Sequence, residues 1–284
     1  MRTNNKDLPL DQFIEFALYD KDKGYYMKKN PFGKEGDFIT APNITRLFSE
    51  IIAIWVVTFW KSIGSPKKFN LVELGAGNGE MMKVIAETLK NFPECFLNCN
   101  FLIHEKSEFL KKKQQINLES EKITWIENIE ITNSFPTIFL ANEFFDALPI
   151  KQFFRKKEGW VERFVDLKEE EKAEFIEQST DIKIIEQKLN FEISKDQEII
   201  EYSPGSFEYL NNICNLIKKN DGGILIIDYG YLNFKMRETL QAINNHKFSS
   251  ILEDIGDSDI TYNINFNLYK KFIDQFDDLN SIIT

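Results

Sequence analysis

A glycine-rich turn between an apolar strand and a helix is the feature that most constrains how this chain folds. The turn lies in the segment LVELGAGNGE, at residues 71–80. Its glycines, Gly75, Gly77 and Gly79, let the backbone pass close to a ligand where a Cβ atom would collide. A helix that begins at Gly79 also presents free N–H groups to that ligand. The sequence therefore predicts a ligand-binding strand–turn–helix unit. The alternative is an ordinary strand-to-helix turn.

Two details of this turn favour S-adenosylmethionine over a dinucleotide. The dinucleotide fingerprint needs a third glycine three residues after the second, and that position is Glu80. Glu73 stands two residues before the first glycine, where a carboxylate would repel a pyrophosphate but attract a sulfonium or an α-amino group. An NAD-linked oxidoreductase is the alternative that these details disfavour. The residues that we expect to contact the cofactor here are Glu73, Gly75, Ala76, Gly77 and Gly79.

Charge and cysteine content exclude several classes of protein. The formal net charge of −10 argues against nucleic-acid binding, which needs a basic face, but it permits a basic protein partner. Three cysteines, Cys95, Cys99 and Cys214, give no disulfide framework and indicate a reducing compartment. With only two histidines in the chain, a structural metal site is not predicted.

The hydrophobic segments do not predict a membrane protein. The most apolar run, residues 51–60, is far shorter than a bilayer-spanning helix, so we expect no membrane insertion. The first residues lack the apolar core of a secretory signal. These observations predict a cytoplasmic protein, and they leave its oligomeric state open.

From residue 69 onward, apolar runs of strand length alternate with segments of helical periodicity. Runs without polar alternation are typical of strands buried on both faces, so the pattern predicts a doubly wound α/β fold with a parallel sheet. The predicted strands cover residues 70–74, 101–105, 122–126, 137–142 and 223–228. The predicted helices cover residues 10–19, 44–63, 80–91, 107–118, 204–219 and 266–276.

Four segments follow from this pattern. Residues 1–64 form an N-terminal helical and lid segment, and residues 65–150 form the cofactor-binding core. Residues 151–200 are an inserted β-rich cap with a hairpin of strands at 152–155 and 160–167, and residues 201–284 return to the core. Such sheets usually close with an antiparallel pair of strands. Residues 279–284 are predicted to form the start of the first strand of that pair. We therefore expect the C-terminal strands to be truncated.

Further polar residues follow the predicted strands, where ligands of open α/β sheets bind. Glu105 ends the second strand, and its carboxylate can accept hydrogen bonds from both hydroxyls of a ribose. A solvated surface acid is the alternative. Asp37, in the loop of residues 36–42, is a candidate for contacting the cofactor or the acceptor from a lid. A structural turn explains that loop as well.

The fourth strand ends in Asn142 and Glu143, followed by two phenylalanines and Asp146. A guanidinium group stays protonated and presents a planar fork of donors, which Glu143 and Asp146 can bind. They would aim one nitrogen at the transferable methyl group, so these three polar residues are the predicted catalytic group. In the alternative interpretation, Asn142 and Asp146 are turn or capping residues and both phenylalanines belong to the core.

These motifs resemble the MidA family of S-adenosylmethionine-dependent methyltransferases, relatives of a mitochondrial complex I assembly factor. Asn43, Ser49 and Asn78 depart from residues common in the family, and the family usually continues beyond the position of Thr284. The matching segments are, in order, GYY (24–26), PFG (31–33), GDFITAP (36–42), ELGAGNG (73–79), ANEFFDALP (141–149), WVER (160–163), IDYGY (227–231), DIT (259–261) and NF (265–266).

The resemblance implies a class I methyltransferase fold, with S-adenosylmethionine as methyl donor. It also implies that a protein arginine is the acceptor, as in the mitochondrial relative, which methylates a complex I subunit. Matched by position, the glycines of the turn and Glu105 fall in the cofactor site, and Asn142, Glu143 and Asp146 fall beside the methyl group. Two alternatives stay open: an assembly factor that binds the cofactor without turnover, and a methyltransferase of small molecules.

Overall fold

The computed structural model describes residues 7–28, 41–132, 134–167, 173–244 and 247–284. These residues divide into two compact units. The first, here called the α/β unit, comprises Tyr26–Phe144 and Leu210–Asp228. The second, called the β-rich unit, comprises Met1–Tyr25, Phe145–Tyr209 and Tyr229–Thr284. The division into four segments at residues 1–64, 65–150, 151–200 and 201–284 stays a prediction from the sequence.

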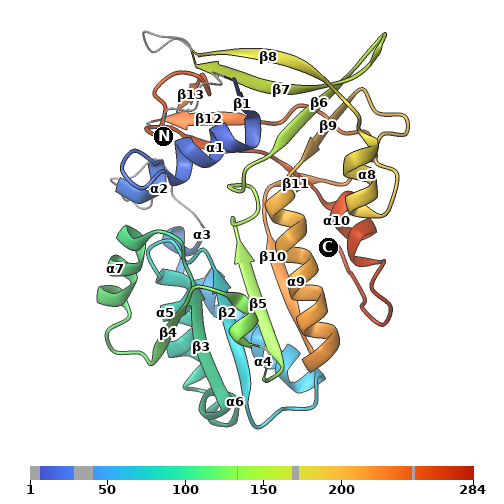
Figure 1. Ribbon diagram of the computed structural model, residues 1–284. Coiled ribbons are helices and arrows are strands. Elements are labelled where there is room, and N and C mark those ends of the chain that lie inside the picture. Colours follow the sequence, from blue (N-terminus) through green and yellow to red (C-terminus); the bar gives the residue numbers. More distant parts are fainter. Residues whose placement is uncertain (1–6, 29–40, 133, 168–172, 245–246) are drawn as a thin grey trace. The chain divides into compact units, whose positions relative to one another are not determined.

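The α/β unit is built on a five-stranded parallel sheet with the strand order β10-β5-β2-β3-β4. Figure 1 shows these strands side by side. The crossovers place later strands on both sides of β2, as the prediction of a doubly wound sheet requires. All five predicted strands are confirmed to within about two residues at each end: β2 (Phe69–Leu74), β3 (Cys99–His104), β4 (Ile123–Ile126), β5 (Thr137–Asn142) and β10 (Gly222–Ile227).

Burial explains why these strands lack polar alternation. Every residue of β2 is buried, and Phe69 and Leu71 join one hydrophobic cluster with residues of α4 and α5. A Cβ atom at Gly223 would lie 2.4 Å from the ring of Phe59, so α4 packs directly on β10. The helices of this unit are α3 (Ala41–Ile44), α4 (Arg46–Ser62), α5 (Glu80–Leu89), α6 (Pro93–Asn98), α7 (Glu108–Asn117), the 3-10 helix η1 (Ile129–Thr132) and most of α9 (Pro204–Asn220).

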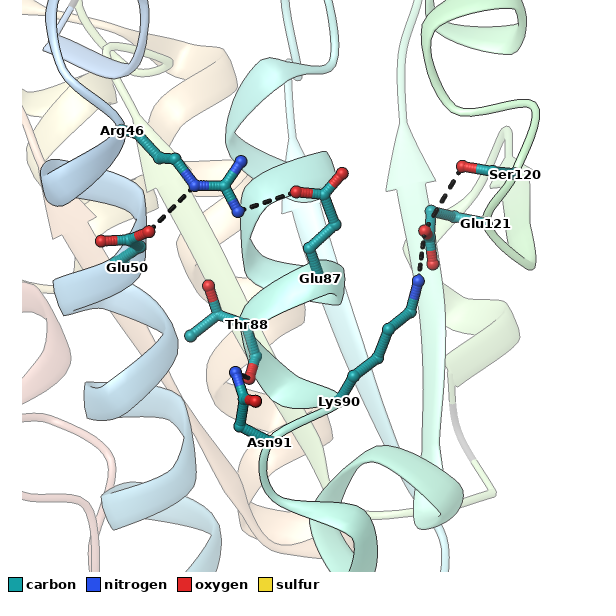
Figure 2. Close-up of polar contacts among 8 residues, drawn as sticks. All are labelled: Arg46, Glu50, Glu87, Thr88, Lys90, Asn91, Ser120 and Glu121. Atoms are coloured by element: carbon teal, nitrogen blue, oxygen red, sulfur yellow. Dashed lines mark hydrogen bonds and ion pairs between the residues drawn. The ribbon is translucent and has the colours of Figure 1, made fainter.

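Surface ion pairs connect the outer sides of these elements (Figure 2). Arg46 at the start of α4 donates from Nε to Glu50 at 2.9 Å and from Nη2 to Glu87 on α5 at 2.7 Å. Lys90 at the end of α5 pairs with Glu121 before β4 at 2.7 Å. Because the arginine is exposed, these pairs orient the helices more than they stabilise them.

The β-rich unit has an antiparallel sheet of order β1-β7-β6-β9, in which β8 also pairs with β7. The hairpin predicted for residues 152–167 is confirmed as β6 and β7. The apolar side of α1, including Phe13 and Leu18, is fully buried. The elements are β1 (Asp7–Pro9), α1 (Leu10–Tyr19), β6 (Lys151–Lys156), β7 (Gly159–Leu167), β8 (Ala173–Thr180), α8 (Lys183–Leu189) and β9 (Ile199–Tyr202).

The remaining elements of this unit are short. Residues 279–284 form no strand and belong to none of the described sheets, so that prediction is wrong. Ile282 is 86% exposed. The short elements are β11 (Gly230–Tyr231), β12 (Gln241–Asn244), β13 (Lys247–Ser249), β14 (Asp259–Thr261), β15 (Ile264–Asn265) and α10 (Phe266–Ile273), with α2 (Tyr25–Lys28) at the division between the units.

Candidate functional site

The glycine turn after β2 has a backbone that only glycine adopts readily. Gly75, Gly77 and Gly79 have φ angles of +66°, +55° and +85°, all in the left-handed region. The N–H of Gly79 closes the turn by donating to the carbonyl of Ala76 at 2.8 Å. A Cβ atom on Gly75 would lie 2.8 Å from the ring of Phe144, which ends this unit. Close approach of an aromatic ring is therefore a second reason for this glycine, one that the sequence did not reveal.

Glu73, two residues before the turn, is a buried carboxyl group. Its side chain lies on the central strand and is 3% exposed, and Oε2 has no hydrogen-bond partner among the described residues. Burial, reinforced by the negative charge of Glu105, raises the pKa of Glu73 to about 8, although the N–H of Met82 opposes this shift. An acid in this environment gains most from a cationic group placed beside it.

Glu105 directly follows β3 and is half-buried, so it is not a solvated surface acid. Its Oε1 accepts a hydrogen bond from the N–H of Ser107 at 2.8 Å, and its Oε2 accepts one from Nε2 of Gln114 at 2.9 Å. Burial raises the pKa of Glu105, and these hydrogen bonds oppose the shift. Each carboxylate oxygen is thus held by a donor, and the N–H of Lys106 is a further donor to this group. The sequence analysis did not identify Gln114.

Glu143 follows β5 in a strained backbone conformation. Its φ of +49° is unusual for a residue with a side chain, and its N–H donates to the carbonyl of Ile227 on β10 at 2.8 Å. Hydrogen bonds from the side chain of Asn142 and the N–H of Ala41 reach its carboxylate. Burial outweighs them and raises the pKa of Glu143. The Asn142 Oδ1 atom is itself buried and has no hydrogen-bond partner in the part of the chain that the structure describes.

The other two predicted site residues are not among the described residues of the α/β unit. Asp146 belongs to the β-rich unit, where its side chain is 6% exposed and its carbonyl accepts from the N–H of Tyr262 at 3.2 Å. Asp37 lies outside the described residues. The phenylalanines between the catalytic candidates differ: Phe145 is fully buried, and Phe144 packs on Gly75.

The residues of the α/β unit fit S-adenosylmethionine. The strands β2 and β5 are parallel neighbours, so Glu73 and Asn142 approach the same edge of the sheet, each with a buried oxygen that lacks a donor. The cofactor carries cationic groups that can satisfy such oxygens, and Glu105 follows the adjacent strand as an acceptor for hydroxyl groups. Among the described residues, no group of three or more His, Cys, Asp or Glu side chains is arranged to hold a metal ion. Nor is any described helix long and apolar enough to cross a bilayer.

Comparison with solved structures shows the same fold. A COG1565 superfamily member from Burkholderia thailandensis, solved with bound S-adenosyl-homocysteine, superposes with a TM-score of 0.80. The two chains are 20% identical, and the match covers 95% of this chain and 72% of that one. A second structure of a COG1565 protein from the same organism gives a TM-score of 0.76 at 20% identity and covers 95% of this chain and 71% of that one. These neighbours confirm the prediction of a class I methyltransferase fold.

Comparison with curated proteins finds relatives that are mitochondrial. The protein arginine methyltransferases NDUFAF7 of Xenopus laevis and Homo sapiens are 26% and 27% identical to this chain and match 94% and 92% of it. The chain spans 66% and 64% of these relatives, slightly less than two thirds of their length. Because they are mitochondrial proteins, the prediction of a cytoplasmic location is wrong.

The comparison with family models finds a match over most of the chain. The model described as "Putative S-adenosyl-L-methionine-dependent methyltransferase" matches residues 51–282, which include the glycine turn and all the site residues of the α/β unit described above. The resemblance inferred from the motifs is confirmed, and S-adenosylmethionine is the cofactor of this family. The chain therefore belongs to a family of S-adenosylmethionine-dependent methyltransferases.

Proposed function

We propose that this chain transfers the methyl group of S-adenosylmethionine to a guanidinium nitrogen of an arginine in a protein, and that a respiratory complex I subunit is that protein. The observation that carries the proposal is Glu143, a strained and half-buried carboxylate that follows β5, the strand paired with β2. Arginine as the acceptor is supported by the names of the curated relatives. Complex I is implied by the family resemblance of the sequence motifs.

Three groups of the α/β unit would hold the cofactor, which supplies the methyl group. The backbone of Gly75, Gly77 and Gly79, with Ala76 between them, lets the methionine part approach the turn closely. Glu73 would pair with a cationic group through its free Oε2 atom. Glu105 would accept the ribose hydroxyls, and Asp37 is proposed as a further contact.

Glu143, Asn142 and Asp146 would handle the acceptor. A guanidinium group is protonated at every physiological pH, so its nitrogen must lose a proton as the new N–C bond forms and the S–C bond breaks. The raised pKa of Glu143 makes its carboxylate a stronger proton acceptor than an exposed glutamate. Asn142 orients this carboxylate by hydrogen bonding, and much of the rate enhancement would come from orientation.

The test combines binding with product analysis. Calorimetric titration of the purified chain with S-adenosylmethionine, S-adenosylhomocysteine and NAD should give binding of the first two and none of NAD. Incubation with the complex I core subunits and labelled S-adenosylmethionine should then label one subunit on arginine, located by mass spectrometry. Cofactor binding with a stable subunit complex but no label would favour the assembly factor without turnover. Label on a small molecule and not on protein would instead favour a methyltransferase of small molecules.

A further inference from the structure

A single buried amide side chain connects the ends of three neighbouring strands in the α/β unit. Gln114 lies on α7 and is fully buried. Its Nε2 atom donates to the carbonyl of Gly77, in the turn after β2, at 2.9 Å and to Oε2 of Glu105, after β3, at 2.9 Å. Its Oε1 atom accepts from the indole N–H of Trp125, on β4, at 2.9 Å. No proposed cofactor contact includes this glutamine.

The hydrogen-bonding partners fix the orientation of the amide. The indole nitrogen of Trp125 can only donate, so it must face the amide oxygen. The carbonyl of Gly77 and an ionised Glu105 can only accept, so both must face the amide nitrogen, whose two hydrogens they use. Rotating the amide by 180° would break all three hydrogen bonds. In its observed orientation the side chain therefore acts as a rigid connector.

We propose that Gln114 is a positioning residue that fixes the carboxylate of Glu105 for the ribose hydroxyls of the cofactor. The N–H of Ser107 holds Oε1 and the Gln114 amide holds Oε2, so the carboxylate cannot rotate without losing a donor. The same amide holds the Gly77 carbonyl, which ties the acid to the glycine turn. This inference rests on the ribose-binding role proposed for Glu105.

A second contact of α7 supports a connecting role for this helix. The Nδ2 atom of Asn117, one turn after Gln114, donates to the carbonyl of Asn78 at 2.8 Å. Two consecutive carbonyls of the turn, those of Gly77 and Asn78, are thus held by amide side chains from one helix. Asn117 is exposed and does not touch Glu105 in the described contacts, so its amide supports the turn alone.

The test compares two ligands that differ only at the ribose. S-adenosylhomocysteine and its 2′,3′-dideoxy analogue are titrated into the full chain and into the variants Gln114→Met, Gln114→Glu and Glu105→Gln. The neighbouring Gln115, which is exposed on the same helix, provides the matched control Gln115→Met. Gln114→Glu keeps an acceptor for Trp125 but loses both donors, so it tests the same contact with less change in packing.

We expect the wild type to prefer the ligand with hydroxyls, and both Gln114 variants to lose roughly 10–100-fold in affinity for that ligand, the effect of one hydrogen bond to a charged group. Because these variants also lose the hydrogen bond to Gly77, their affinity for the dideoxy analogue should fall by much less than their affinity for S-adenosylhomocysteine, and binding of the analogue also reports that they are folded. The ratio of the affinities for the two ligands should be the same in the Gln114 variants as in Glu105→Gln. Gln115→Met should behave as the wild type.

Two different results would overturn the inference. If the Gln114 variants lose affinity for both ligands equally, or keep the wild-type preference, Gln114 has only a structural role, while the proposal for Glu105 stands. If the wild type itself binds both ligands equally, Glu105 does not bind the ribose and the inference is rejected with that assignment. The two failures are thus distinguishable in one data set.

Discussion

Burial of the Glu73 carboxyl group makes the stability of the ligand-free chain depend on pH. Its pKa rises from 4.5 to about 8 on folding, so the folded state keeps a proton that the unfolded state releases above pH 4.5. The free energy of unfolding therefore falls as the pH rises from about 4.5 through 8. At about 1.4 kcal/mol for each unit of pKa, the loss amounts to several kcal/mol.

We predict that Glu73→Gln stabilises the ligand-free chain at pH 8 but not at pH 5, because the amide never ionises. Thermal unfolding at both pH values measures this, with the exposed Glu130→Gln as the control. The same variant should bind S-adenosylmethionine more weakly than the wild type does. Equal stabilisation at pH 5 and pH 8 would mean that Glu73 does not titrate between them.

Glu143 should affect methyl transfer and not cofactor binding. We predict that Glu143→Gln lowers the rate of methyl transfer by roughly 10²–10⁴-fold, the usual contribution of a general base, since an amide cannot accept the proton that the acceptor loses. Its affinity for S-adenosylhomocysteine should stay close to that of the wild type. Single-turnover kinetics and calorimetry measure these two quantities, with the exposed Glu119→Gln as the control. A normal rate would remove Glu143 from the mechanism.

For single residues, the sequence predicts a role in the site only where neighbouring residues form a recognisable pattern. Glu73 and the glycines were identified because their spacing along one strand and turn is itself the signal. Gln114 was not, because its partners lie 37, 9 and 11 residues away and meet only when the strands pair. No local pattern marks a glutamine in a run of lysines and glutamines as buried.

The turn between β2 and α5 is the element that we propose to contact the cofactor. We predict that Gly75→Ala destabilises the chain, because the new Cβ atom would lie 2.8 Å from the Phe144 ring and the φ of +66° disfavours alanine. In the Phe144→Ala background the collision is absent, so Gly75→Ala should there cost only the roughly 1–2 kcal/mol that comes from the backbone. Chemical denaturation of the single and double variants measures both parts.

Gly205→Ala on α9 is the matched control, since nothing lies within 4 Å of the point that its new Cβ atom would occupy and its φ is not positive. That change should leave stability unaltered or raise it slightly. If Gly75→Ala proves as harmless as the control, the ring of Phe144 does not restrict the turn.

Elements were predictable where burial imposes a pattern on the sequence. The strands of the parallel sheet are mostly apolar and lack the strict polar alternation of a half-exposed strand, which distinguishes them from the helices. The strand β8 was missed because its side chains are mostly exposed and polar, and only pairing with β7 defines it. The strand predicted near the C-terminus failed for the opposite reason: residues 282 and 283 are apolar, but no described strand pairs with them.

At the scale of the whole molecule, the negative charge is unequally divided. The α/β unit has as many lysines and arginines as aspartates and glutamates, so the net charge of −10 belongs to the β-rich unit. Charge complementarity increases the rate at which an oppositely charged partner associates. A protein segment rich in arginine and lysine would therefore be attracted to the β-rich unit, whereas a neutral cofactor product would gain nothing.

We predict that the KM for a basic protein substrate rises as the salt concentration increases from 50 mM to 300 mM, while kcat changes little. Screening over a Debye length of about 10 Å at 0.1 M weakens long-range attraction but leaves the chemical step unaffected. Binding of S-adenosylhomocysteine, measured at the same salt concentrations, is the control and should stay constant because that ligand carries no net charge. A KM that does not respond to salt would show that the acidic unit does not attract the substrate, and the basis of recognition would then lie in apolar or hydrogen-bonding contacts.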